Sequence, residues 1–114
     1  MADPALSLLE YHVLLALSGG KLHGYAIKDA VAADSAGTQT PRAGSLYRVV
    51  GRLLTDGLVR EEESDPRAEP HPGLERRYYA LTASGKRALA AEAQRLKGTA
   101  AIAAKRLGTL GGSR

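Results

Sequence analysis

Arginine and tyrosine side chains in residues 42–56 give this sequence its clearest capacity for chemistry. Apolar residues repeat there at helical spacing, which places Ser45, Arg48 and Arg52 on the opposite face of a helix. A guanidinium group donates two parallel hydrogen bonds and so suits guanine edges and phosphate oxygens. Tyr47 lies beside this face, where its hydroxyl would reach a phosphate or its ring would pack within the fold. An ordinary solvated helix face is the alternative interpretation.

Positive charge is concentrated in the second part of the chain. The net charge is +4, with −2 on residues 1–41 and +6 on residues 42–114. Residues 42–60 contain four arginines, Arg42 among them, against a single aspartate. Such clustering is typical of a phosphate-binding surface. Residues 61–75 carry a net charge of −5, so we expect that segment to stay clear of nucleic acid.

Catalytic and metal-binding patterns are missing from the sequence. The histidines His12, His23 and His71 lack the spacing of metal ligands, and the chain contains no cysteine. Ser45 lacks the flanking residues of a nucleophile elbow. We therefore expect no enzyme activity, no metal and no cofactor. For His23, a helix N-terminus or a phosphate contact is the better functional interpretation.

Two helices are predicted before the arginine-bearing segment. Residues 6–17 lie between a proline and a Gly-Gly pair, which bound the first helix. Its apolar residues cover most of its circumference, so we expect burial on more than one side, with a second subunit as one cover. Residues 24–33 form the second helix, which ends at the turn-rich segment 34–41.

The third helix is predicted to start near Arg42 or Ala43 and to end at Asp56, before Gly57, which suits the left-handed position after a helix. Gly51 lies inside this helix, where glycine costs about 1 kcal/mol relative to alanine. Close packing or close approach to DNA would each account for it, and the sequence does not decide between them.

A hairpin follows, with predicted strands at residues 58–63 and 76–81 and a proline-bearing tip between them. Arg76 and Arg77 begin the second strand, beside Tyr78 and Tyr79. The order helix, basic hairpin, helix is typical of a winged helix-turn-helix, in which one helix enters the major groove and the hairpin contacts the DNA backbone.

The last predicted helix begins at Thr82 or Ser84, although Gly85 stands where a capping box would have glutamate. Its apolar residues alternate at spacings of four and three, which is the pattern of paired helices. These residues, with three from the first helix, form the predicted dimer interface: Leu6, Leu9, Val13, Leu89, Ala93, Leu96, Ala100, Ala103 and Leu107.

The predicted fold class is mainly α with a small β-hairpin, a winged helix-turn-helix with a C-terminal dimerisation helix. We expect residues 1–82 to form the DNA-binding domain, 83–107 the dimerisation helix and 108–114 a flexible tail. No apolar run is long enough to cross a membrane, and the N-terminus lacks the basic start of a signal peptide. We therefore expect a cytoplasmic, nucleoid-associated protein without a membrane partner.

At these residues the chain resembles the PadR family of bacterial transcriptional regulators, in the short form with a single C-terminal helix. The resemblance depends on motifs that occur in the family's order over residues 6–107. They include Leu22-His23-Gly24-Tyr25, Gly44-Ser45-Leu46-Tyr47 and Arg76-Arg77-Tyr78-Tyr79.

The resemblance implies a homodimer that represses transcription by binding a palindromic operator in double-stranded DNA. In some members a small-molecule effector or another signal releases the operator. Ser45 stands where threonine is common and Arg48 where proline is frequent, so the operator sequence does not transfer. Family position together with charge predicts these DNA-binding residues: Tyr25, Arg42, Ser45, Tyr47, Arg48, Arg52, Arg76 and Arg77.

Two further hypotheses stay open. A winged helix also serves as a docking module for proteins without binding DNA, and the acidic segment 61–75 favours that function. The third hypothesis extends the repressor hypothesis. The protein would then be a ligand sensor, whose effector enters between the first and last helices.

Overall fold

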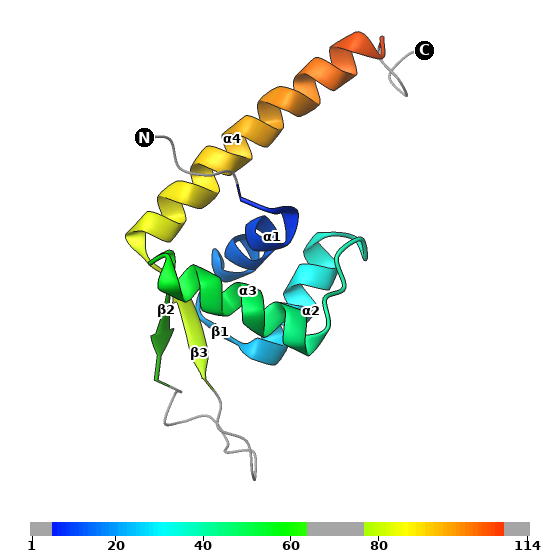
Figure 1. Ribbon diagram of the computed structural model, residues 1–114. Helices are drawn as coiled ribbons and strands as arrows, with labels where there is room; N and C mark the ends of the chain where they lie inside the picture. Colours follow the sequence, from blue (N-terminus) through cyan, green and yellow to red (C-terminus); the bar gives the residue numbers. More distant parts are fainter. Residues whose placement is uncertain (1–5, 64–76, 109–114) are drawn as a thin grey trace.

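The computed structural model describes residues 6–63 and 77–108 (Figure 1). Their elements are α1 (Leu8–Leu17), β1 (Leu22–His23), α2 (Gly24–Asp34), α3 (Ala43–Thr55), β2 (Val59–Glu62), β3 (Tyr78–Leu81) and α4 (Ala83–Arg106). The mainly helical class with a hairpin is confirmed. The tip of the hairpin, Arg76 and most of the predicted tail lie outside the described residues.

The sheet has one strand more than the predicted hairpin. Its order is β1-β3-β2, and both neighbouring pairs are antiparallel. Strand β1 pairs Leu22 with Tyr79 and His23 with Tyr78. The predicted two-stranded hairpin is corrected in this respect, because a strand of two residues is too short to have a recognisable alternation of polar and apolar residues.

The core lies where α1, α2, α3 and the sheet meet. Apolar side chains from each helix are fully or almost fully buried, among them Leu14, Ile27 and Leu53. Val13 of α1 has no exposed surface, so it belongs to this core. Its assignment to the dimer interface is corrected, because a side chain without exposed surface has none to offer a second subunit.

The first turn of α4 is attached to the turn between α3 and β2. Thr82 Oγ1 accepts a hydrogen bond from Gly85 N at 3.0 Å and donates one to Gly57 O at 2.6 Å. Thr82 is therefore the cap of α4. A Cβ on Gly85 would lie 2.0 Å from Leu58 O, so this backbone contact requires glycine and excludes the glutamate of a capping box.

Helix α4 continues far beyond the body of the protein (Figure 1). Its first half packs against the core through Ala88 and Leu89. Residues 97–108 are all exposed, with Ile102 at 48% and Leu107 at 62%. No helix among the described residues is long and apolar enough to span a bilayer.

Candidate nucleic-acid interface

Helix α3 has one buried side and one open side. Leu46, Val49, Val50 and Leu53 face the core. At 100° per residue, the opposite side consists of four exposed residues, which we call the outer face of α3. The outer face contains Gly44, Arg48, Gly51 and Thr55. Because two of the four are glycines, Arg48 is the long side chain that projects from its centre.

Arg48 has no ion pair or hydrogen bond to any other described residue. Its guanidinium group is therefore uncompensated within the part of the chain that the structure describes. An exposed and unpaired arginine at the centre of a helix face is available for an anionic partner or a guanine edge. The exposure of Arg48 agrees with the prediction from helical spacing, and its contact with DNA stays a prediction.

Arg52 differs from Arg48, although the sequence predicted one shared face. Its Nη1 lies 3.5 Å from Glu10 Oε2 on α1, and the side chain of Glu10 is only 11% exposed. Glu10 Oε1 also accepts a hydrogen bond from Ser7 N at 2.7 Å, in the capping box of α1. The ion pair therefore connects α3 to the capped start of α1, at the edge of the outer face.

Two tyrosines lie at the N-terminus of α2. Tyr25 is 68% exposed and Tyr47 is 51% exposed. Tyr47 packs against Gly24, since a Cβ there would lie 2.8 Å from the Tyr47 hydroxyl oxygen. This contact brings the hydroxyl group of Tyr47, in α3, to the start of α2. The pair presents two phenol groups to solvent beside the first turn of a helix.

The first turn of α2 is capped by a histidine. His23 Nδ1 accepts a hydrogen bond from Ala26 N at 3.3 Å. The imidazole also meets the ring of Tyr78 edge to face, with centroids 5.7 Å apart. His23 therefore lies at a helix N-terminus, as predicted.

The start of α3 adds further polar groups. Arg42 precedes the helix, is exposed, and makes no side-chain cap. Ser45 in the first turn is half-buried. A helix N-terminus carries partial positive charge from its free N–H groups, and Arg42 increases the positive potential there.

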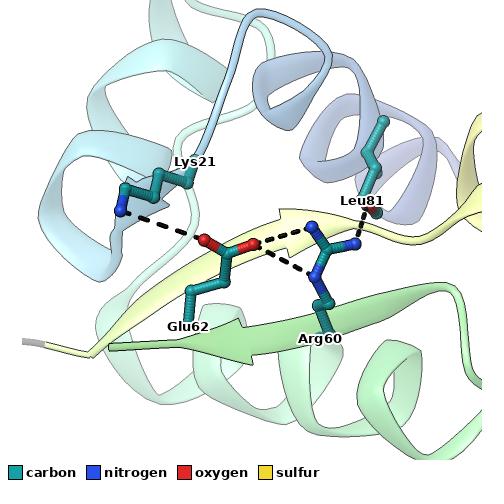
Figure 2. A network of polar contacts seen from close by, with 4 residues as sticks. All are labelled: Lys21, Arg60, Glu62 and Leu81. Atoms are coloured by element: carbon teal, nitrogen blue, oxygen red, sulfur yellow. Dashed lines mark hydrogen bonds and ion pairs between the residues drawn. The ribbon is translucent and has the colours of Figure 1, made fainter. Parts of the chain in front are cut away.

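The outer side of the sheet carries a network of charges (Figure 2). Glu62 accepts hydrogen bonds from Arg60 Nε at 3.1 Å and Nη2 at 2.7 Å. The same carboxylate lies 3.9 Å from Lys21 Nζ, which also stands 5.6 Å above the ring of Tyr78. Arg60 Nη1 donates to Leu81 O at 2.9 Å. This arginine is therefore held flat along the sheet.

Arg77 is also paired within the wing, the hairpin of β2 and β3. Its Nη1 lies 3.5 Å from Glu61 Oε1 on the neighbouring strand. Burial raises the pKa of the nearby Tyr79 hydroxyl, and the negative charge of Glu61 raises it further. Tyr79 thus stays neutral and belongs to the interior. The cations Arg60 and Arg77 are both partly neutralised by glutamates of the same hairpin.

Three contacts of this region are not evident in the sequence. They are Glu10 with Arg52, Gly24 with Tyr47, and Lys21 with Glu62. Each joins residues far apart in the chain, so no local spacing signals it. The Ser7–Glu10 capping box was readable as a motif, but the second role of Glu10 toward α3 was not.

The fold and the open side of α3 define the class of the protein. Three helices, a wing and an exposed third helix are the architecture of a DNA-binding winged helix-turn-helix. The chain belongs to the transcriptional regulator PadR-like family, whose sequence profile matches residues 13–91.

Solved structures of the family superpose on the chain. A PadR-like transcriptional regulator from Bacillus cereus matches with a TM-score of 0.74 at 20% identity, over 89% of this chain and 92% of that one. A PadR family transcription regulator from Clostridium difficile matches with a TM-score of 0.72 at 22% identity, over 90% of this chain and 100% of that one. At these identities the likeness concerns the fold.

A third relative was solved with nucleic acid. Bacillus subtilis PadR in complex with operator DNA matches with a TM-score of 0.60 at 25% identity. The match covers 73% of this chain and 45% of that one, so this chain spans less than half of that protein's length. No curated protein matches the chain.

Proposed function

We propose that this protein is a sequence-specific, dimeric DNA-binding repressor whose α3 enters the major groove of a palindromic operator. The observation that carries the proposal is the unpaired guanidinium group of Arg48 at the centre of the outer face of α3. The operator complex of the Bacillus subtilis relative supports DNA as the partner of this fold.

In this proposal the DNA-binding residues have different roles. Arg48 meets base edges, while Tyr25, Tyr47, Ser45 and Arg42 meet the phosphates around them, because hydroxyl and guanidinium donors suit phosphate oxygens. Arg52 chiefly holds α3 on α1 through Glu10, 3.5 Å away. Arg76 and Arg77 are the proposed contacts of the wing, and Arg77 must leave or share its glutamate to meet a phosphate.

The proposed dimer interface is the exposed part of α4. Ala100, Ala103 and Leu107 lie on one face of that helix and are exposed in the part of the subunit that the structure describes. Leu89, Ala93 and Leu96 continue the face toward the body, where Leu6 and Leu9 are half-buried as well. Small alanine side chains permit close approach of a second helix. A two-fold dimer then presents two copies of α3 to two half-sites.

Release by a small-molecule effector is the regulatory part of the proposal. An effector that binds in the seam between the first and last helices would change how the two outer faces are spaced. Such a ligand should raise thermal stability and lower operator affinity, and by linkage its own affinity must then fall when operator is bound.

The test is selection of bound duplexes from random DNA, followed by affinity measurements at several salt concentrations. We expect an inverted repeat with half-sites about 34 Å apart, or a multiple of one helical turn. If the dimer contacts ~6 phosphates, the slope of log affinity against log salt is about −5. A protein that selects no duplex, or an affinity that hardly depends on salt, contradicts the proposal.

The alternative is a protein-interaction module. The exposed carboxylates of Glu61 and Glu63 on the described part of the hairpin favour it, because they would be repelled by phosphate. A stable complex with another protein, combined with no duplex recovered in the selection, would favour this alternative.

A further inference from the structure

We propose that Gly51 allows α3 to approach the operator more closely than any side chain at that position would permit, and thereby positions Arg48 against the bases. This inference rests on the proposed function, because it assumes that the outer face of α3 is turned toward DNA. It makes Gly51 a positioning residue for the contact that Arg48 makes.

Nothing in the described residues 6–63 and 77–108 requires glycine at this position. A Cβ built on Gly51 meets no atom within 4 Å, so no neighbour needs the space. Gly51 is also not among the residues with positive φ. The contrast is with Gly24 and Gly85, where a Cβ would collide with Tyr47 and Leu58. Close packing, one of the two explanations that the sequence left open, is therefore excluded.

A glycine in a helix interior lowers stability relative to alanine, so a glycine on the helix face proposed to meet DNA, which no neighbour in the fold explains, fits a requirement for close approach there. Gly51 is exposed and lies on the outer face, one turn after Arg48. Gly44 lies one turn before Arg48 and is equally open. The centre of the face is thus bare backbone on both sides of one long cationic side chain.

The neighbouring polar groups strengthen this assignment. The Thr55 hydroxyl, on the same face, donates to Gly51 O at 3.0 Å and so is already engaged. Arg52, beside the face, is paired with Glu10. A helix with its side chains is about 10–12 Å wide, which nearly fills a major groove about 12 Å wide. Removing a side chain from the inserted face is the direct way to let the backbone move deeper.

The experiment compares Gly51→Ala with Gly98→Ala. Gly98 lies inside α4, is exposed, and also has no atom within 4 Å of a built Cβ. At 100° per residue it points away from the α4 face formed by Ala100 and Ala103. Both variants should raise Tm by about 4 °C, because alanine is the better helix former.

Affinity for the selected duplex should distinguish Gly51→Ala from Gly98→Ala. Gly51→Ala should bind the duplex selected by the wild type about tenfold more weakly, while its binding to an unrelated duplex stays within about twofold. Gly98→Ala should match the wild type on both duplexes. A gain in stability accompanied by a loss of specific affinity cannot result from damage to the fold.

Three results would overturn the inference and leave the proposed function in place. If the wild type selects a duplex and Gly51→Ala binds it equally well, Gly51 has no role in approach, and the proposed function stands. If Gly98→Ala loses as much affinity, the effect is not particular to the outer face of α3. If Gly51→Ala lowers Tm, glycine at this position is required by the folded structure itself. A wild type that selects no duplex overturns both this inference and the proposed function.

Discussion

Arg48 and Arg52 have the same side chain and lie one turn apart on α3, but their surroundings differ. Arg48 projects from the outer face without a partner among the described residues. Arg52 is 57% exposed and pairs with a carboxylate that is only 11% exposed. A charge already held by a largely buried partner must give up that contact before it meets DNA, whereas a free charge gives up only water.

We therefore predict different results for the two alanine substitutions. Arg48→Ala should weaken binding to the selected duplex by about 1–3 kcal/mol and relax the preference at one base position, with little change in Tm. Arg52→Ala should lower the free energy of unfolding by up to about 1 kcal/mol, because Glu10 loses its partner. Duplex titrations and thermal melts of both variants check this. Equal losses of specific affinity would show that Arg52 also meets the operator.

At the scale of single residues, the sequence predicts which side chains of a helix are exposed or buried better than it predicts their contacts with other elements. Helical spacing correctly predicted that Arg48 is exposed and that Leu46 is buried. It could not distinguish Arg52, because Glu10 reaches that residue only after α1 and α3 pack together. Val13 was placed on the wrong side for a related reason: α1 is apolar over most of its circumference, so spacing alone could not show which side faces the core.

Among the elements, the junction between the α3–β2 turn and α4 holds the wing in place. Gly57 has a φ of +76°, a conformation in which other residues are strained. Its carbonyl accepts the hydroxyl of Thr82, and Leu58 O accepts the backbone N–H of the same residue at 3.1 Å. The entry to the wing and the start of α4 are therefore one packed unit.

Gly85→Ala should be strongly destabilising, since its Cβ would lie 2.0 Å from a backbone oxygen that cannot move alone. We expect a loss of about 3 kcal/mol in the free energy of unfolding, which exceeds the about 1 kcal/mol that alanine contributes within a helix. Gly98→Ala in the same helix is the matched control and should be slightly stabilising. Chemical denaturation of both variants measures the difference, and a stable Gly85→Ala would mean that the junction is loose.

Periodicity predicted the elements because each long helix has a repeating apolar stripe. The bounds of α1, α2 and α3 differ from the expected ones by no more than two residues. Strand β1 was missed, because two residues show no alternation and its pairing with β3 arises only in the folded chain. A cap was predicted for α4 without deciding between Thr82 and Ser84, and the Gly57 contact that distinguishes them is not local.

In the molecule as a whole, Glu92 helps to fix the direction of α4. Its side chain is 8% exposed and is held by Arg95, one turn later. The hydrogen bond from Arg95 lowers the pKa of Glu92, and a contact with the backbone of Leu6, just before α1, lowers it further. The carboxylate therefore connects α4 to the chain segment that enters α1.

A lowered pKa predicts the sign of the pH dependence. The charged form stabilises the fold, so its contribution is complete above the ordinary value of 4.5 and is lost as the pH falls through the lowered pKa. Glu92→Gln should therefore have a lower Tm than the wild type at pH 7, and the difference should shrink below pH 4.5. Thermal melts across this range provide the measurement. A difference that stays constant with pH would mean that packing, not charge, makes the contribution.

The projecting end of α4 is the best place to test the proposed dimer, because a substitution there cannot disturb the body of the subunit. Ala103 is exposed and shares a helix face with Ala100 and Leu107. Ala103→Glu would place a charge on the apolar face that the proposed dimer buries, so light scattering should report a monomer with an unchanged far-UV spectrum. Ala101→Glu, almost half a turn away around the helix, is the control and should stay dimeric. Since one outer face of α3 cannot cover two half-sites, the monomeric variant should also lose most of its affinity for the inverted repeat while still binding a single half-site weakly. An Ala103→Glu protein that remains dimeric would exclude this face of α4 from the interface.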